Sequence, residues 1–195
     1  MSSIKVAKLA LRKKMKEIIA QLSAEEKQRQ SMKVFKKLCS LPQFQESKRV
    51  SVYLSTKDEI DTTQILRYMF EKGKEVFVPR YNGKRMEMVK LLSMEDYEKL
   101  PLTKWNIKQP NFDEPRENAL QTGGLDLVLV PGVAFTASGK RLGHGMGYYD
   151  KFLDMCFKNQ QKRPHTIAVA FNEQLWEDIP TSENDVLLDL VLTEK

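Results

Sequence analysis

Glycine is concentrated in one short stretch of this chain. Seven of its nine glycines lie between residues 123 and 147, and the stretch ends in Arg141-Leu-Gly-His-Gly-Met-Gly-Tyr-Tyr-Asp150. Because glycine costs chain entropy inside a regular element, three glycines at alternate positions indicate a backbone that lies close to something. No other segment departs so far from the composition of an ordinary globular protein.

The residues around these glycines predict a strand, a loop and a helix. Residues 125–131 read as a buried strand, and residues 148–157 read as a short helix. The first turn of a helix carries unpaired N–H groups and the positive end of the helix dipole, which suit an anion such as phosphate. We therefore expect the active site at this loop.

A plain turn without a ligand shares this strand–loop–helix pattern. The charges of Arg141 and Asp150 favour an anion site, because a plain turn does not need them. The loop lacks the Gly-x-x-x-x-Gly-Lys-Ser/Thr spacing of a P-loop. It is also a poor dinucleotide fingerprint, since its glycines alternate and residues 132–141 separate them from the strand.

The rest of the chain predicts alternating helices and strands. Two helices are expected over residues 4–22 and after a capping box at Ser23, and a further helix is expected between Asp61 and Gly73. Strands are expected at 49–55, 75–80, 86–92, 125–130, 166–171 and 189–193, and residues 101–121 form a long polar connection of the kind that covers a site.

This order of elements predicts an α/β fold. Specifically, we expect a three-layer sandwich, with a mostly parallel sheet and helices on both faces. A length of 195 residues without a linker or repeat predicts a single domain over residues 1–195. Charged residues follow most of the predicted strands, and ligands of such sheets bind at the strands' carboxyl ends.

Charge and hydropathy narrow the class of protein. No apolar run approaches the roughly 20 residues that span a bilayer, and no apolar leader is visible, so we expect a cytoplasmic protein without a membrane partner. Cys39 and Cys156 lack CxxC spacing and are expected to be buried, reduced thiols.

Positive charge gathers at the N-terminal end, where residues 1–37 hold eleven Lys or Arg against three Glu. These cations either cover the solvent face of two amphipathic helices or, in part, face a polyanionic small molecule. They lack interleaved aromatic residues, and no nucleic-acid-binding motif is present, so no nucleic-acid partner is expected.

Pro131-Gly-Val-Ala-Phe135, followed by the motif 141–150, closely resembles the 5-formyltetrahydrofolate cyclo-ligase family (methenyltetrahydrofolate synthetase). Further matches follow in order along the chain, at Lys8-Leu-Ala-Leu-Arg12, Tyr53-Leu-Ser55, Glu59-Ile-Asp61, Val78-Pro-Arg80, Trp105-Asn-Ile-Lys-Gln-Pro110, Gly123-Gly-Leu-Asp126 and Glu183-Asn-Asp185. The motif Arg-Leu-Gly-x-Gly-x-Gly-x-Tyr-Asp is specific, whereas the other matches are weak singly and strong in series.

The resemblance implies an ATP- and Mg²⁺-dependent enzyme that cyclises 5-formyltetrahydrofolate to 5,10-methenyltetrahydrofolate and releases ADP and phosphate. A formamide oxygen is a poor leaving group, so ATP would phosphorylate it to an iminium phosphate, and N10 would then displace phosphate. Such chemistry needs positioning and charge neutralisation more than covalent participation by the protein. The implied partner is a reduced folate, with or without a polyglutamate tail, and we expect a monomer.

The same resemblance assigns residue roles. The ATP contacts would be Lys8, Arg12, Arg141, Leu142, Gly143, His144, Gly145, Met146, Gly147, Tyr148 and Tyr149, with Arg141 and Tyr149 as the catalytic residues. Mg²⁺ would bind Asp150 and Asp185. Without the resemblance, Lys8 and Arg12 would read as surface cations, Asp150 as an acid that meets the helix dipole, and Asp185 as a turn residue.

The folate contacts implied are Leu54, Glu59, Trp105, His144, Gly145, Met146, Gly147 and Tyr148. Glu59 would hydrogen-bond the aminopyrimidinone edge, and Trp105 would stack on the pterin. Many relatives carry Lys where this chain has Met146; Lys140, Arg141 and Arg80 are candidates to supply that charge.

Two other classes are compatible with parts of this pattern. One is a sugar-phosphate isomerase or acyl-CoA transferase on a similar scaffold, which would not depend on ATP. The other is a binding module, for example for RNA, that uses the basic N-terminal helices and whose affinity would fall steeply with salt.

Overall fold

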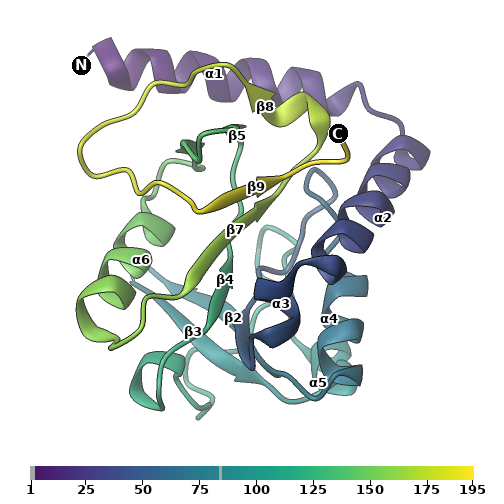
Figure 1. The fold of residues 1–195 in the computed structure, drawn as a ribbon, viewed down its shortest axis with the longest axis vertical. Coiled ribbons are helices and arrows are strands. Elements are labelled where there is room, and N and C mark those ends of the chain that lie inside the picture. The colour runs from purple at the N-terminus through teal and green to yellow at the C-terminus, as the bar shows by residue number, and fades with distance from the viewer. Residues whose placement is uncertain (1–2, 84) are drawn as a thin grey trace.

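The computed structural model describes residues 3–83 and 85–195, and its centre is a six-stranded sheet (Figure 1). The strands are β1 (Arg49–Ser51), β2 (Glu75–Asn82), β3 (Arg85–Leu91), β4 (Leu127–Leu129), β7 (His165–Val169) and β9 (Leu190–Leu192). They lie in the order β3-β2-β1-β4-β7-β9, and all neighbours run parallel except the antiparallel pair β2 and β3.

Helices cover both faces of this sheet. One face carries α1 (Ser3–Ala20), α2 (Ala24–Ser40), α3 (Pro42–Glu46), α4 (Thr63–Glu71) and α5 (Met94–Lys99), and the other carries α6 (Tyr148–Asn159) and the 3₁₀ turn η1 (Ala119–Gln121). Figure 1 shows α6 on the left of the sheet, α2 to α4 on the right, and α1 across the top. The predicted three-layer α/β fold is therefore confirmed.

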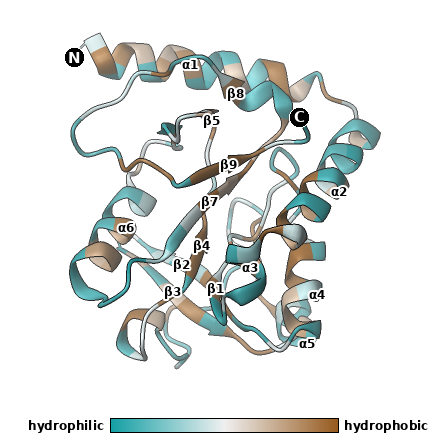
Figure 2. Ribbon diagram, in the orientation of Figure 1, coloured by the Kyte–Doolittle hydropathy of each residue, from teal (hydrophilic) through white to brown (hydrophobic). Residues whose placement is uncertain are grey.

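The alternation of side chains along β4 divides the core in two. Leu127 and Leu129 pack in the cluster that includes residues of α1 to α4, whereas Val128 and Val130 pack with α6. Figure 2 shows β4 and β9 as hydrophobic, while α2 is mostly hydrophilic. A continuous apolar run is what a strand buried on both faces requires.

A second, smaller sheet was not expected from the sequence. It joins β5 (Ala134–Thr136), β6 (Arg141–Leu142) and β8 (Leu175–Trp176) in the order β6-β5-β8. β5 and β6 are antiparallel and pair Phe135 with Arg141. This hairpin occupies the segment that separates the central strand from the glycine loop, and it holds Arg141 at the start of that loop.

Several predicted boundaries differ from the structure. β1 ends at Ser51 instead of Ser55: Val52 still donates to the Phe77 carbonyl at 2.9 Å, but the Tyr53 carbonyl already accepts from the Thr62 hydroxyl at 2.8 Å. Thr62, not Asp61, is the N-cap of α4, although an Asp61 carboxylate oxygen accepts from the Thr63 N–H at 2.9 Å. The short helices α3 and α5 were not predicted.

The cysteine prediction holds in part. Cys156 is buried and Cys39 is half-buried, and both are free thiols. Burial raises the pKa of Cys156 to about 12 and that of Cys39 to about 11, so both stay protonated near neutral pH. No helix among residues 3–83 and 85–195 is long and apolar enough to cross a membrane.

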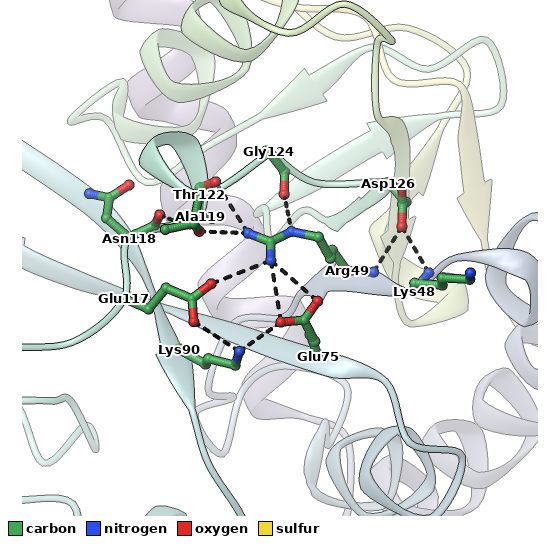
Figure 3. A network of polar contacts seen from close by, with 10 residues as sticks. All are labelled: Lys48, Arg49, Glu75, Lys90, Glu117, Asn118, Ala119, Thr122, Gly124 and Asp126. Atoms are coloured by element: carbon green, nitrogen blue, oxygen red, sulfur yellow. Dashed lines mark hydrogen bonds and ion pairs between the residues drawn. The ribbon is translucent and has the colours of Figure 1, made fainter.

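A network of polar contacts closes the amino-terminal edge of the parallel strands (Figure 3). Arg49 donates through Nε to the Gly124 carbonyl at 2.7 Å and through Nη2 to the Thr122 hydroxyl at 2.8 Å. Its Nη1 also pairs with Glu75 and Glu117, and Lys90 bridges the same two carboxylates at 2.6 and 2.8 Å.

The network fastens a loop to this edge of the sheet. Besides the contacts of Arg49, one Asp126 oxygen accepts the N–H groups of Lys48 and Arg49, each at 2.8 Å. The segment from η1 to β4 is thereby tied to the beginnings of β1 and β2. The carboxyl edge of the sheet is left for a ligand, which is where ligands bind in folds of this class.

We predict that Glu117→Gln destabilises the protein in a pH-dependent way. The hydrogen bond from Lys90 lowers the pKa of Glu117 to about 2, from 4.5 for the free group. The Glu117 charge therefore stabilises the fold above about pH 4.5, and this contribution is lost as the pH falls toward 2. The variant should have a lower Tm than the wild type at pH 7, with a difference that narrows below pH 4.5.

Glu98→Gln provides the control, because Glu98 is an exposed residue of α5. Thermal unfolding followed by circular dichroism should show little change for this variant at any pH. Matching pH profiles for the two variants would contradict the role of the network.

Candidate functional site

The glycine loop, residues 143–147, connects β6 to α6 at the carboxyl edge of the sheet. A Cβ atom on Gly143 would lie 2.8 Å from Nη1 of Arg141, and Gly145 and Gly147 have φ angles of +112° and +68°. Any other residue would therefore collide or be strained at each of the three positions. His144, Gly145 and Met146, in the middle of the loop, are exposed to solvent.

The buried Arg141 forms an ion pair with the half-buried Asp150 next to this loop. Nη2 of Arg141 lies 2.8 Å from Oδ2 of Asp150, and Nη1 donates to the Pro131 carbonyl at 3.0 Å. The other Asp150 oxygen accepts the Val186 N–H at 3.0 Å. The pair thus joins the strand before the loop, the helix after it and the C-terminal segment.

Helix α1 brings two further cations to the loop. Arg12 donates through Nε to the Gly143 carbonyl at 2.8 Å, and Nζ of Lys8 lies 2.5 Å from Asp185. Burial lowers the pKa of Arg12, and the charge of Asp185 opposes that shift. The structure therefore brings together Lys8, Arg12, Arg141 and the loop, although more than 120 positions of sequence separate α1 from the loop.

Two buried polar atoms next to the loop are poorly satisfied: Nε of Arg141 has no hydrogen-bond partner among the described residues, and the hydroxyl of Tyr149 has no well-aligned one, although the Tyr81 phenol is close enough to interact with it. The Arg141 guanidinium lies 6.0 Å from the centre of the Tyr149 ring. Burial raises the pKa of Tyr149 well above its usual value, and the neighbouring Tyr81 phenol adds to the shift. A buried donor without a hydrogen bond lowers the stability of the fold by about 1–3 kcal/mol. Two such donors side by side therefore indicate a place where a bound ligand supplies the acceptors.

Glu59 approaches the loop from the segment after β1. Its Oε1 lies 3.5 Å from Nε2 of His144, and its Oε2 accepts the Thr56 N–H at 2.8 Å. The Glu59 side chain is only 13% exposed, whereas that of His144 is 64% exposed. Leu54, from the same segment, is buried in the core cluster on the α1–α4 face.

Tyr148, the first residue of α6, joins the loop to the β2–β3 hairpin. Its hydroxyl donates to the Gly83 carbonyl, and its ring lies 4.9 Å from that of Tyr81 at an angle of 50°.

Trp105 is the predicted site residue that the structure leaves apart. It is 69% exposed, at the tip of a turn closed by a bridge between Leu102 and Lys108, and the Lys104 ammonium lies 4.3 Å from its ring centre. No contact found among the described residues joins Trp105 to another predicted site residue.

Gln109 is a positioning residue that the sequence pattern did not reveal. Its side-chain amide accepts the Tyr81 N–H and donates to the Tyr81 carbonyl, both at 3.1 Å, as an added strand would. A single Gln in a polar connection carries no periodic signal that points to such a partner. Gln109 thereby fixes the connection 101–121 to the end of β2.

Two of the cations considered as substitutes at Met146 are already engaged. Arg80 donates to the carbonyls of Asn111 and Glu114, at 3.0 and 2.7 Å, and pairs with Glu87. Lys140 lies 2.6 Å from Asp178.

The acidic residues suit a metal ion that arrives with a ligand. No group of three or more His, Cys, Asp or Glu able to hold a metal occurs within residues 3–83 and 85–195. Asp150, on α6, accepts the N–H of Val186, the residue after Asp185, so the two carboxylates come from two segments that are in contact, and both already meet cations. Mg²⁺ commonly binds one or two carboxylates together with phosphate oxygens and water, and this pair fits that donor set.

Comparison with known proteins points to one family. A model described as the 5-formyltetrahydrofolate cyclo-ligase family matches residues 4–194. The chain is 45% identical over 194 residues to the 5-formyltetrahydrofolate cyclo-ligase of Mus musculus, covering 98% of this chain and 96% of the mouse protein. It is 44% identical over 197 residues to the probable 5-formyltetrahydrofolate cyclo-ligase of Caenorhabditis elegans, covering 100% of this chain and 96% of the other.

A solved structure agrees with these matches. The NMR structure of 5,10-methenyltetrahydrofolate synthetase from Aquifex aeolicus superposes with a TM-score of 0.77 at 33% identity, covering 96% of this chain and 90% of the other.

We predict that Tyr149→Phe does not reduce stability. The Tyr149 hydroxyl is buried and has no well-aligned hydrogen bond within the described residues, so its removal should leave Tm unchanged or raise it. Thr62→Val is the matched control, because the Thr62 hydroxyl is equally buried but donates to the Tyr53 carbonyl. That variant should lose about 1–3 kcal/mol of unfolding free energy in denaturant titrations. A similar loss in Tyr149→Phe would mean that its hydroxyl has a partner within the protein.

Proposed function

The chain belongs to the 5-formyltetrahydrofolate cyclo-ligase family, and we propose that it cyclises 5-formyltetrahydrofolate to 5,10-methenyltetrahydrofolate with ATP as the phosphoryl donor. The family and the enzyme class expected from the sequence are thus confirmed. The observation that carries the proposed reaction is the gathering of Lys8, Arg12 and Arg141 around a glycine loop that begins a helix.

The loop and its cations would bind the phosphates of ATP. The N–H groups in the first turn of α6 and the positive end of its dipole face the loop, where negative charge is favoured. Lys8 and Arg12 add side-chain donors from α1, and the loop residues Leu142 to Tyr149 supply backbone contacts. Nucleotide binding would also explain why Lys8 and Arg12, on a helix at the surface, point toward the loop and the C-terminal segment.

Arg12 is our candidate for the charge that relatives obtain from Lys at position 146. A Cβ atom on Gly145 would lie 3.6 Å from the Arg12 guanidinium, so this cation stands next to Met146. Arg80 and Lys140 are held by other carboxylates, and Arg141 is held by Asp150.

Mg²⁺ would enter with the nucleotide and meet Asp185 and Asp150. Asp185 accepts from Lys8 and Ser182 through Oδ2, which leaves Oδ1 available. The metal would neutralise part of the phosphate charge, and the protein's residues would determine where the phosphates lie.

The reaction requires two bond exchanges. The formyl oxygen forms a bond to the γ-phosphorus as ADP leaves. The N10 lone pair then attacks the formyl carbon, the carbon–oxygen bond breaks, and the departing phosphate takes up the proton that N10 loses. The unpaired Nε of Arg141 and the unpaired hydroxyl of Tyr149 are the donors available for the transferring phosphoryl group. Their burial keeps water from competing for these hydrogen bonds.

Folate would bind on the side of the loop that Glu59 and Tyr148 flank. Glu59 is held in place by the Thr56 N–H and offers a carboxylate to the aminopyrimidinone edge of the pterin. Leu54 lies in the same segment, and His144 to Gly147 face the substrate. The proposed stacking of Trp105 on the pterin requires the turn 102–108 to fold over the loop.

Other expectations from the sequence remain predictions. These are a single domain over residues 1–195, a monomeric and cytoplasmic protein, and the absence of a nucleic-acid partner. Membership of a ligase family supports neither the isomerase or transferase class nor the nucleic-acid-binding module considered from the sequence.

We predict methenyl product from the purified protein supplied with 5-formyltetrahydrofolate, ATP and Mg²⁺. The product's near-ultraviolet absorbance should grow only when all three are present, with one ADP released per ring closed, and chelation of Mg²⁺ by EDTA should stop it. Product formed without ATP would contradict the phosphoryl-transfer route. No product, with a known family member active alongside, would contradict the proposed activity.

We predict that Arg12→Ala raises KM for ATP by about 10- to 100-fold, the effect of losing a charge-assisted hydrogen bond worth about 1.5–3 kcal/mol. KM for the folate should change much less. Lys13→Ala is the control, because Lys13 is exposed on the same helix. Adding Met146→Lys to Arg12→Ala should restore part of the ATP affinity. Equal losses for both substrates would remove Arg12 from the phosphate site.

A further inference from the structure

A groove of about 370 Å³ runs along α6, beside β3 and η1. Apart from Tyr148, none of its lining residues belongs to the site described above. Its apolar lining is formed by Met86, Met88, Leu120, Tyr148, Phe152 and Met155, and Arg85 and Lys151 also line it. Small-molecule sites commonly have volumes of about 300–1,000 Å³, so the groove is large enough for part of a ligand.

The apolar part of the groove suits a flat aromatic ring. Met86, Met88 and Phe152 are buried in the cluster on the α6 face, while Met155 is 41% exposed beside them. Methionine sulfur makes favourable contacts with aromatic rings, and its flexible side chain adapts to their shape.

The charges of the groove suit an acidic group. Lys151 is exposed on α6, and its side chain forms no ion pair or hydrogen bond found within residues 3–83 and 85–195. The Arg85 side chain is 75% exposed and lies 3.6 Å from Glu87. Glu87 also pairs with the buried Arg80 at 3.1 Å, so one carboxylate is shared by two guanidinium groups and a net positive charge remains.

The groove is continuous with the glycine loop through Tyr148. This residue lines the groove, is the first residue of α6 after Gly147, and is held to the β2–β3 hairpin at Gly83. A ligand whose reacting atoms lie at the loop therefore reaches the groove past the Tyr148 ring.

We propose that this groove holds the p-aminobenzoylglutamate part of the folate, with the glutamate carboxylates near Arg85 and Lys151. N10, which must lie at the loop to close the ring, is bonded directly to the aminobenzoyl ring. That ring must therefore lie within a bond of the reacting centre. The groove is the apolar surface next to the loop, and its two cations complement the charge of the glutamate carboxylates. This inference rests on the proposed function, because it assumes that the substrate is a reduced folate.

The test compares substrates that differ only in the tail. Wild type, Arg85→Gln, Lys151→Gln and the double variant are assayed with monoglutamyl and triglutamyl 5-formyltetrahydrofolate at saturating ATP and Mg²⁺. Each single variant should raise KM for the triglutamyl substrate about two- to fivefold, the effect of losing one exposed ion pair worth up to about 1 kcal/mol. KM for the monoglutamyl substrate should rise less, and kcat and KM for ATP should stay at wild-type values.

Lys158→Gln is the matched control, because Lys158 lies two turns further along α6, outside the groove, and pairs with Asp154. For the apolar part, Met155→Glu should raise KM for both folates and Met155→Leu should not. An unchanged ratio of the two KM values in the double variant would overturn the assignment of the tail, as would a wild-type KM in Met155→Glu.

A binding measurement separates this inference from the reaction itself. Calorimetry with p-aminobenzoyl-triglutamate needs no turnover, and its affinity should fall in the double variant but not in Lys158→Gln. If the wild type binds this probe at the groove and forms no methenyl product, the proposed function fails while the groove stands. If the wild type turns over folate and the probe binds equally to all variants, the groove assignment fails alone.

Discussion

The ion pair between the buried Arg141 and the half-buried Asp150 is the contact on which the candidate site depends. A buried charge without a partner is strongly destabilising, so Arg141 requires Asp150. Through Pro131 and Val186 the pair also joins the end of the central strand to the C-terminal segment. The same guanidinium excludes a side chain at Gly143, so the first of the alternating glycines and the ion pair belong to one arrangement.

The two edges of the parallel sheet use polar groups differently. At the amino edge, the network around Arg49 pairs its charges with one another and ties the chain before β4 to the sheet. At the carboxyl edge, Arg141 and Tyr149 leave donors unpaired, and α1 adds two cations. Of the four buried side-chain polar atoms without a partner among the described residues, these two lie at the glycine loop and the positive end of a helix dipole, and the others are Ser51 Oγ and Arg116 Nε.

Sequence reasoning succeeded where the signal is local. The apolar periods of α1 and α2 and the short apolar runs of β4 and β7 identified helices, strands and the parallel sheet, because burial on one or both faces determines such patterns. It missed β5, β6 and β8, because these strands of two or three residues do not lie within a longer apolar or alternating run, as the equally short β1, β4 and β9 do. It also missed Gln109, and it grouped Trp105 with the loop although no contact of the described structure joins them.

The sequence by itself determined the family, the α/β fold and the position of the glycine loop, because a specific motif and a local pattern of burial are both written along the chain. Only the tertiary structure shows the contacts by which distant charges meet that loop. Helical periodicity makes Lys8 and Arg12 surface cations and the family resemblance assigns them to ATP, but their contacts with Gly143 and Asp185 come from the packing of α1. The groove beside Tyr148 likewise exists only once α6, β3 and η1 are packed together, because its lining comes from three separate segments.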